Sequence, residues 1–410
     1  MKRFIFTLCY LLTLVLYTNA KESIFLSRAN QAKMNAWVDS AYNAMTPEER
    51  VGQLFAQVVN PKHQAAARKE IKRLVEIYHI GCIYFSAGTA KQHAELADYA
   101  NSLSSVPLMT AIDGEWGLSM RIPSTPRFPK NMALGAIQND RLLYEYGREM
   151  ARECREMGIN INFAPSVDVN SNPRNPVIGI RSYGEDPANV TRKAISYARG
   201  LEDGGVLSVA KHFPGHGDTN SDSHKTLPTV DHSLAYLRMT DIAPFQSYIN
   251  AGLGGIMVAH LNVPALGTKG SPTSLSERVV SKLLKNELGF KGLVFTDALA
   301  MKGARRSNKA NGLPALLAGA DVLLEPYPDI LDYYKSGDKQ ASTIARAVKK
   351  ILSFKYAMGL NNRKPITYEG MLSKINSRQA ELVQRKLYAA SMTILKNEND
   401  ILPVKHLDRK

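Results

Sequence analysis

The chain alternates short apolar runs with segments of helical periodicity, and this pattern restricts its fold more than any other feature. Continuous apolar runs are typical of strands buried on both faces of a parallel sheet, because neither face meets water. Segments with helical patterns lie between the runs, at 64–77, 92–103, 140–157, 189–203, 277–288 and 314–318. Strands that alternate with helices in this way predict an α/β protein with a (β/α)8 TIM-type barrel. The eight expected strands are 51–59, 80–85, 108–113, 159–165, 207–212, 255–260, 293–297 and 320–325.

The sequence predicts the last element of the barrel more clearly than the first. The first run, 51–59, is the least regular, since Pro47 and the two glutamates that follow it are typical of a helix start. At the other end, residues 343–358 predict a closing helix with its apolar residues on one face. We therefore place the barrel at residues 43–360, after a lead-in at 21–42.

Residues 361–410 do not continue the barrel pattern. After a linker, the segment 387–404 has the pattern of a helix end, a strand, a turn and another apolar run. A segment of this length cannot bury a hydrophobic core by itself. Two interpretations follow: either the tail packs on the barrel, or it is the incomplete start of a second domain of a longer protein.

Residues 1–20 predict a secretory signal peptide rather than part of the fold. Lys2 and Arg3 precede an uncharged, mainly apolar stretch at 4–17, and small residues at 18–20 offer a cleavage site. The alternative is an uncleaved anchor, although the stretch is short for a membrane span. Cleavage would give an exported protein, periplasmic or secreted, without a stable membrane span.

Cysteine content and charge narrow the class of protein. The chain has three cysteines, so it is not a disulfide-rich scaffold. Cys82 and Cys154 would remain after cleavage; they either pair or, as we expect in a core of this size, are buried thiols. The net charge of +15 indicates an anionic partner only weakly, because the basic residues are scattered. We expect no nucleic-acid partner.

Titratable side chains gather where the predicted strands end. In barrel enzymes, the loops at the carboxyl ends of the strands form the active site. Any one such residue could serve as a helix cap or a loop clamp, but five converging strand ends favour an active site over a solvated rim. The residues at these ends are Asp113 with Arg121, Asp168 with Arg181, Lys211 with His212, His260, and Asp297.

The segment 211–224 is the densest group of such residues. It contains three histidines and two aspartates, and Pro214 and its glycines prevent a helix. The spacing of these histidines and aspartates matches no zinc motif, so we expect no metal ion. Asp222 and His224 suit a different chemistry. A carboxylate beside an imidazole can fix its tautomer and stabilise the imidazolium, which makes a general acid/base.

Several segments resemble glycoside hydrolase family three. KHFPGHGDTNSDSH at 211–224 resembles the signature of its β-N-acetylglucosaminidase branch, and VFTDALAMKG at 294–303 resembles the family's nucleophile strand. DGEWGLSMR at 113–121 resembles its sugar-binding loop, and APSVDVN and RSYGEDP add two further matches. The resemblance covers the barrel, 43–360. The tail from residue 375 resembles the start of the α/β sandwich domain that follows the barrel in longer members.

The resemblance implies a role for each matching residue. Asp297 would be the nucleophile that attacks the anomeric carbon, and His224, held by Asp222, would be the acid/base. Asp113 would accept hydrogen bonds from the sugar hydroxyls. Four side chains would donate to them: Arg121, Arg181, Lys211 and His212. Secondary candidates, for which a structural role is equally expected, are Asp168, His216, His260 and Met301. The resemblance implies no cofactor.

The implied partner is a carbohydrate. The implied activity is that of an exo-acting, retaining β-N-acetylglucosaminidase (β-N-acetylhexosaminidase) that releases N-acetylglucosamine from peptidoglycan fragments or chito-oligosaccharides. The turn after Asp113 reads Gly-Glu-Trp-Gly and departs from the Glu-Gly-Gly of single-domain bacterial members, which leaves the subsite contacts open. Two alternatives remain: a β-glucosidase or glycoside phosphorylase on the same scaffold, or an inactive saccharide-binding remnant.

Overall fold

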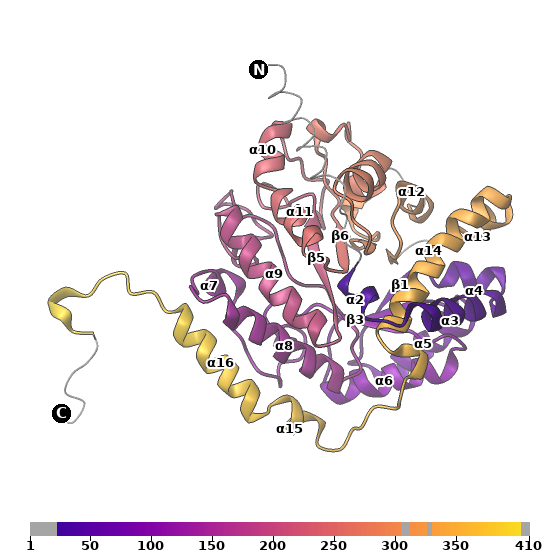
Figure 1. The fold of residues 1–410 in the computed structure, drawn as a ribbon, viewed down its shortest axis with the longest axis horizontal. Helices are drawn as coiled ribbons and strands as arrows, with labels where there is room; N and C mark the ends of the chain where they lie inside the picture. The colour runs from indigo at the N-terminus through magenta and orange to yellow at the C-terminus, as the bar shows by residue number, and fades with distance from the viewer. Residues whose placement is uncertain (1–22, 305–310, 326–329, 403–410) are drawn as a thin grey trace, which may run out of the picture.

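Eight parallel strands form a nearly closed barrel, as predicted. The structure is a computed structural model that describes residues 23–304, 311–325 and 330–402 (Figure 1). The strands pair in the order β7-β6-β5-β4-β3-β2-β1-β8, and an isolated parallel bridge between Phe295 and Val322 joins the two edges. The strands are β1 Phe55–Val59, β2 Cys82–Phe85, β3 Met109–Ile112, β4 Ile161–Asn162, β5 Leu207–Phe213, β6 Gly255–Val258, β7 Leu293–Thr296 and β8 Leu323–Leu324.

Helices surround this barrel (Figure 1). The closing helix, α14, is longer than predicted, since it begins at Asp338 and ends at Ala357. Helix α11 is one of several that lie outside the helical segments predicted from the sequence. The main helices are α5 Gln64–Glu76, α6 Ala90–Leu103, α8 Arg141–Glu156, α9 Pro187–Asp203, α11 Ala243–Asn250, the π-type helix η5 Arg278–Glu287 and α12 Gly312–Ala318.

The first strand is shorter than the apolar run that predicted it. Residues 51 and 52 belong to helix α4 (Pro47–Gly52), and β1 begins at Phe55. The helix starts with a capping box, in which Thr46 accepts from the Glu49 N–H and the Glu49 carboxylate accepts from the Thr46 N–H. Proline and glutamate at its first positions favour the helix over an extended chain.

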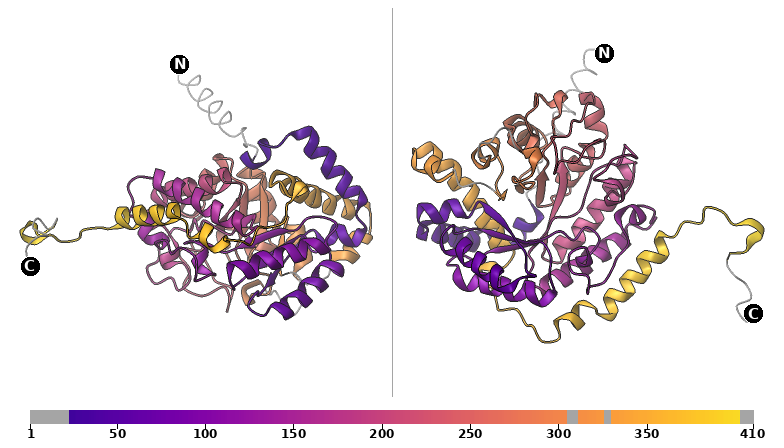
Figure 2. Two further views of the ribbon diagram at one scale, coloured as in Figure 1. Left: turned by 90° about the horizontal axis from the view of Figure 1, so that it is seen from below. Right: turned by 180° about the vertical axis from the view of Figure 1, so that it is seen from behind.

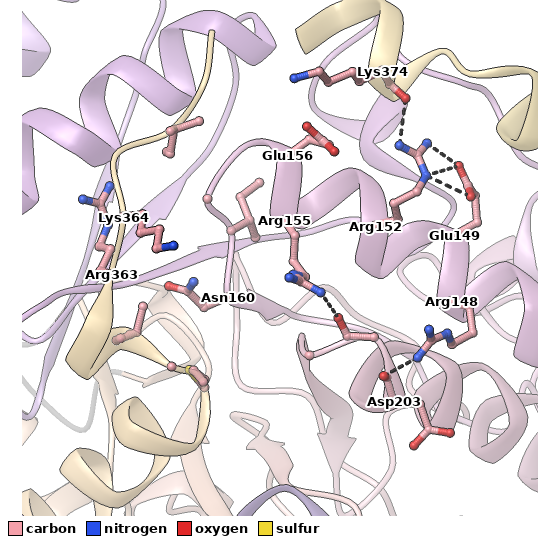
Figure 3. A pocket seen from close by; sticks show the side chains of 18 of the residues that line it. Arg148, Glu149, Arg152, Arg155, Glu156, Asn160, Asp203, Arg363, Lys364 and Lys374 are labelled. Carbon is pink, nitrogen blue, oxygen red and sulfur yellow. Dashed lines mark hydrogen bonds and ion pairs between the residues drawn. The ribbon is translucent and has the colours of Figure 1, made fainter. Parts of the chain in front are cut away.

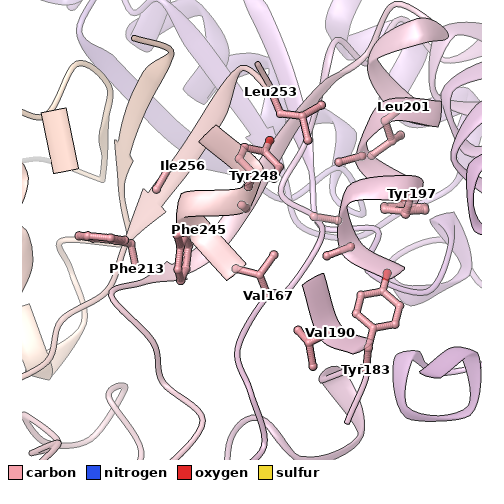
Figure 4. Packing of buried hydrophobic residues seen from close by; sticks show 14 of the residues in the cluster. Val167, Tyr183, Val190, Tyr197, Leu201, Phe213, Phe245, Tyr248, Leu253 and Ile256 are labelled. Carbon is pink, nitrogen blue, oxygen red and sulfur yellow. The ribbon is translucent and has the colours of Figure 1, made fainter. Parts of the chain in front are cut away.

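Buried side chains from the outer helices pack on the barrel strands (Figure 4). Phe213 at the end of β5 meets Phe245 of α11 edge to face, with 5.1 Å between the ring centroids. Tyr146 of α8 and Tyr197 of α9 lie 4.9 Å apart and join these two helices. Apolar burial of this kind is the main force that holds helices on a barrel. Cys82 and Cys154 are both buried free thiols.

Two helices precede the barrel. They are α2 (Ile24–Ser27) and α3 (Gln31–Ala44), which lie against α14. Phe25 stacks on Phe354 with ring centroids 6.4 Å apart. The predicted signal segment, 1–20, lies outside the described residues. Within the described part of the chain, no helix has both the length and the apolar character needed to cross a membrane.

The tail packs on the barrel and then leaves it. Helix α15 (Met371–Ile375) and helix α16 (Arg378–Ser391) lie along α8, and α16 buries Val383 and Leu387 against the core. The expected strand after this helix is absent from residues 392–402, which extend away from the barrel (Figure 2). A strand needs a neighbour for its backbone hydrogen bonds, and this segment has none among the described residues.

Candidate active site

Lys211 connects two carboxylates at the mouth of the barrel. Its Nζ lies 2.8 Å from the Asp113 Oδ1 and 2.8 Å from the Glu115 Oε1. Strands β3 and β5 supply these residues at their carboxyl ends, and only 4% of the Lys211 side chain is exposed. Burial lowers the pKa of Lys211, but the two carboxylates outweigh that effect and raise the pKa above its ordinary value. Lys211 is therefore a fixed cation at the base of the site.

Two arginines complete this ionic group. Arg181 donates through Nε and Nη2 to the two oxygens of Glu115, at 2.9 and 2.7 Å. Arg121 donates to Asp113, whose Oδ2 also accepts from the Tyr84 hydroxyl at 2.8 Å. Burial raises the pKa of both carboxyls, but the cations outweigh it, so that the pKa of Glu115 falls to about 2 and that of Asp113 falls further. Both carboxylates therefore stay ionised.

His212 lies between a carboxylate and a guanidinium. Its Nδ1 donates to the Asp168 Oδ2 at 2.7 Å, and its Nε2 accepts from the Arg181 Nη2 at 3.2 Å. Asp168 is fully buried and also accepts from Ser166 and from the backbone N–H of His212 and His216. Asp168 therefore fixes the tautomer and the orientation of His212 rather than facing the opening of the site.

Asp297 is partnered differently from the other carboxylates. Its Oδ1 accepts from the Ala298 N–H at 2.8 Å, whereas no hydrogen bond within the described chain engages its Oδ2. Burial raises the pKa of Asp297, but the nearby imidazoles of His260 and His212, the Ala298 N–H and Lys211 hold it below its ordinary value. Asp297 is thus an ionised carboxylate with one oxygen available, at the carboxyl end of β7.

The Asp222–His224 pair forms a hydrogen-bonded unit in an outer position. The Asp222 Oδ1 accepts from the His224 Nδ1 at 2.8 Å and from its backbone N–H at 2.9 Å. About two thirds of the His224 side chain is exposed, at 66%. The loop rests on the segment after Asp297, because the Gly303 N–H donates to the Ser223 carbonyl at 3.0 Å. The pair therefore lies beside the site, with the His224 side chain open to solvent.

Two of the secondary candidates have structural contacts. The His216 Nδ1 donates to the Thr219 hydroxyl at 2.7 Å, and its Nε2 accepts from Ser223 at 3.2 Å, so His216 braces the loop that holds His224. The His260 Nε2 donates to the Ala298 carbonyl at 3.0 Å and positions the chain next to Asp297. Met301 is buried on the same segment.

Glycine is required where this loop crosses the barrel rim. A Cβ on Gly217 would lie 1.6 Å from the carbonyl oxygen of Val169, a separation that no side chain tolerates. Gly215 has a φ of +137° and lies against Asp241. These two contacts fix the loop base and leave the outer part, with Asp222 and His224, at the surface.

Sequence reasoning missed two acidic residues of this group. In the sequence, Glu115 stands out only as part of an unusual turn, but it accepts from both Lys211 and Arg181. Glu325 follows β8, has a φ of +53° and is half-buried. Burial raises its pKa first, and the charge of Asp297 adds to the rise. Glu325 could have been identified from the sequence by its position at the end of the eighth predicted strand, since active-site residues lie at strand ends in barrel enzymes.

No group of three or more His, Cys, Asp or Glu side chains in the described ranges is arranged to hold a metal ion. The site instead consists of carboxylates and cationic side chains that are joined to one another by ion pairs and hydrogen bonds. Such an arrangement can bind hydroxyl groups through both donors and acceptors. It can also keep one carboxylate, Asp297, ionised beside them.

Comparison with known proteins shows the family of this chain. Residues 46–354 match the sequence model described as the Glycosyl hydrolase family 3 N terminal domain. The Beta-hexosaminidase A of Pseudoalteromonas piscicida is 38% identical over 285 residues, which are 63% of this chain and 47% of that protein. The chain thus spans about half the length of this relative. The Beta-hexosaminidase LpqI of Mycobacterium tuberculosis is 34% identical over 334 residues, which are 76% of this chain and 83% of that protein.

A solved structure gives the same result. The β-N-acetylglucosaminidase of glycoside hydrolase family 3 from Paenibacillus sp. str. FPU-7 superimposes with a TM-score of 0.78 at 34% sequence identity. The alignment covers 87% of this chain and 70% of that one.

Proposed function

Because the chain belongs to glycosyl hydrolase family 3, we propose that it is an exo-acting, retaining β-N-acetylglucosaminidase. Its substrates would be β-linked glycans that end in N-acetylglucosamine, such as peptidoglycan fragments or chito-oligosaccharides. The observation that supports this proposal most directly is Asp297, an ionised carboxylate whose Oδ2 has no hydrogen-bond partner among the described residues and which lies near a group of side chains suited to bind hydroxyls.

The ionic group around Lys211 would hold the terminal sugar. Asp113 would accept hydrogen bonds from hydroxyls, while Arg121, Lys211 and Arg181 would donate to them. In the tautomer that Asp168 holds, the Nε2 of His212 would accept from a hydroxyl rather than donate to it. Each of these side chains is already fixed by a partner, so binding costs little ordering of the site. A preorganised sugar subsite places the anomeric carbon in one position relative to Asp297.

The first step would form a covalent glycosyl-enzyme. The Asp297 Oδ2 attacks the anomeric carbon, and the bond from that carbon to the leaving oxygen breaks. The imidazolium of His224 gives its Nε2 proton to the leaving oxygen, while Asp222 holds Nδ1. In the second step, neutral His224 takes a proton from water as the water oxygen attacks the anomeric carbon and releases Asp297. Configuration is retained because the carbon is inverted twice.

For this mechanism, the loop with His224 has to move towards the sugar. His224 is exposed, and the Gly303 N–H donates to the carbonyl of Ser223, the residue before it. Catalytic hydrogen bonds in unliganded enzymes are often incomplete and form only when substrate binds. The exposed position of His224 is consistent with a residue that is delivered to the site by its loop.

The decisive experiment compares aryl glycosides. We would measure nitrophenol release from the β-glycosides of N-acetylglucosamine, N-acetylgalactosamine and glucose, each with and without inorganic phosphate. The proposal predicts a preference for the N-acetylglucosaminide and no dependence on phosphate. A preference for the glucoside, or release that requires phosphate with a sugar phosphate as product, would replace it with one of the two alternative activities. No release from any substrate would indicate a binding protein.

A further inference from the structure

A second hollow lies at the opposite end of the barrel from the candidate active site. Its floor includes Ile159 and Asn160, just before β4, and Gly204 and Gly205, just before β5. These are the amino ends of the strands, whereas the candidate site lies at the carboxyl ends. The hollow has a volume of about 1260 Å³, and α8 and the linker after α14 form opposite walls (Figure 3). We call it the basal groove.

Basic side chains outnumber acidic ones in the basal groove by eight to four. The acidic residues are Glu145, Glu149, Glu156 and Asp203. The basic residues are Arg28, Arg141, Arg148, Arg152, Arg155, Arg363, Lys364 and Lys374. Half of these cations are already paired: Arg152 with Glu149, Arg28 with Asp203, Arg363 with Asp98 and Arg141 with Glu145.

The other four cations of the basal groove form no salt bridge among the described residues, although the charge of Arg148 helps to lower the pKa of the Asp203 carboxyl. Arg148 and Arg155 protrude from α8 and donate only to the backbone carbonyls of Asp203 and Gly204. Lys364 and Lys374 form no ion pair within the described chain. A carbonyl does not neutralise a guanidinium, so these side chains keep their full charge and most of their donors.

Three of the four arginines of α8 form a regular row. Arg141, Arg148 and Arg155 are seven residues apart, and seven residues of a helix fall about 20° short of two full turns. They therefore lie on one face, at intervals of about 10.5 Å along the helix. Such a row suits a linear ligand with anionic groups at regular, wide intervals.

We propose that the basal groove binds an anionic polysaccharide and holds the enzyme on it while the candidate active site remains open. Guanidinium groups match the geometry of carboxylate, phosphate and sulfate groups. The four carboxylates between them can accept hydrogen bonds from sugar hydroxyls. The site is separate from the one that carries out hydrolysis and does not depend on its specificity.

A nucleic acid fits the basal groove less well. A nucleic-acid strand carries a phosphate about every 3.4 Å of helix axis, far closer than the arginine row. Nucleic-acid grooves for single strands also stack bases on aromatic side chains. The groove offers Tyr144, but Arg141 already covers its ring, with 4.8 Å between the guanidinium carbon and the ring centroid.

The test compares one polymer backbone with different charges. Binding of the full chain to neutral dextran, carboxymethyl-dextran and dextran sulfate would be measured at several salt concentrations. The expected result is salt-sensitive binding to the two charged polymers and none to neutral dextran. The double variant Arg148→Gln with Arg155→Gln should bind them at least about tenfold more weakly, since two charge-assisted contacts are lost.

Matched variants show whether a loss of binding comes from the basal groove or from the lower net charge of the whole protein. Arg199→Gln with Lys282→Gln removes the same charge from exposed positions outside the basal groove and should bind like the wild type. Lys364→Gln with Lys374→Gln changes the groove without touching α8 and should also weaken binding. Hydrolysis of a small aryl glycoside should be equal in all variants, so failure of binding does not affect the proposed activity.

Several outcomes would overturn the proposal. The first is that the wild type shows no salt-sensitive binding to the charged dextrans. The second is that the groove variants and the control variant lose binding equally. The third is that a 20-base-pair DNA duplex binds more tightly than either charged dextran. The last result would assign the groove to nucleic acid instead.

Discussion

Three aspartates at the mouth of the barrel have the same chemistry but different surroundings. Asp113 accepts from Tyr84, Arg121 and Lys211, and Asp168 accepts from two side chains and two backbone N–H groups. Asp297 accepts only from the Ala298 N–H among the described residues. A carboxylate saturated by donors is a poor nucleophile, because its lone pairs are engaged. The surroundings thus favour Asp297 for attack and leave binding or positioning to the other two.

The first prediction concerns Asp297 itself. Asp297→Asn should lower hydrolysis by at least about 10³-fold, because an amide cannot form the glycosyl-enzyme ester. Circular dichroism and thermal unfolding should show that the fold is intact, since the amide oxygen can still accept from Ala298. A fluorinated sugar that accumulates the intermediate should label Asp297 in the wild type. Labelling of another carboxylate, Glu325 included, would reject the assignment.

The second prediction concerns the Asp222–His224 pair. His224→Ala should impair glycosides with poor leaving groups about 10²–10⁴-fold more than nitrophenyl glycosides, because only the former need protonation of the leaving oxygen. Asp222→Asn should give a smaller effect of the same kind, because the imidazole remains but loses the carboxylate that orients it. The measurement is kcat/KM against leaving-group acidity. Equal losses on all leaving groups would mean that the pair only braces the loop.

At the scale of elements, the packing of α8 on α9 depends on two glycines. A Cβ on Gly147 would lie 2.1 Å from the Tyr197 carbonyl oxygen, and a Cβ on Gly200 would lie 2.2 Å from the Tyr144 carbonyl oxygen. The two helices therefore meet backbone to backbone. Neither glycine has a positive φ, so close approach rather than conformation explains them.

The third prediction follows from this contact. Alanine normally stabilises a helix relative to glycine by about 0.5–1 kcal/mol. Gly147→Ala and Gly200→Ala should instead destabilise the protein by about 1–3 kcal/mol, because the added methyl group forces the helices apart. Denaturant unfolding measures the sign directly. Ser196→Ala on α9 adds no atom and serves as the control, and a stabilised glycine variant would show that the helices separate without cost.

The fourth prediction concerns Glu202, which joins α9 to the barrel. It accepts from the Ser208 hydroxyl at 2.7 Å and from the Gly254 N–H at 2.8 Å, while its second oxygen is buried without a hydrogen-bond partner in the part of the chain that the structure describes. Burial raises its pKa from 4.5 to about 7. A raised carboxyl pKa contributes stability at low pH that is lost as pH rises through about 7.

Glu202→Gln should therefore stabilise the protein at pH 8 by up to about 3 kcal/mol and change little at pH 5. The amide can accept the same two hydrogen bonds without an ionisation cost. Free energies of unfolding at the two pH values test this, with exposed Glu76→Gln as the control. A gain of equal size at both pH values would exclude the ionisation of Glu202 as its cause.

At the scale of the whole molecule, the fifth prediction is export. We propose that residues 1–20 are removed as a secretory signal and that the mature protein begins near Lys21. Amino-terminal sequencing of protein from the native host measures this, and the cytoplasmic fraction is the control. A chain that keeps Met1 in the membrane fraction would support the uncleaved anchor instead.

The barrel and the members of its mouth could be predicted from the sequence, because both depend on local patterns. Buried strands give apolar runs, and parallel strands bring their carboxyl ends to one edge wherever the helices lie. For this reason, the pattern of residues is enough to group Asp113, Lys211 and Asp297. The shorter β1 was partly visible as well, in the capping signals around Pro47.

Tertiary structure alone decided how those residues are paired. Whether Lys211 meets Asp113, Glu115 or Asp297 depends on distances of a few ångströms between strands that are far apart in sequence. The same holds for Glu325, whose neighbour Asp297 lies on another strand, and for the basal groove, whose walls come from α8 and the distant linker. Interactions between charges depend on separation and burial, and a sequence fixes neither until the chain is folded.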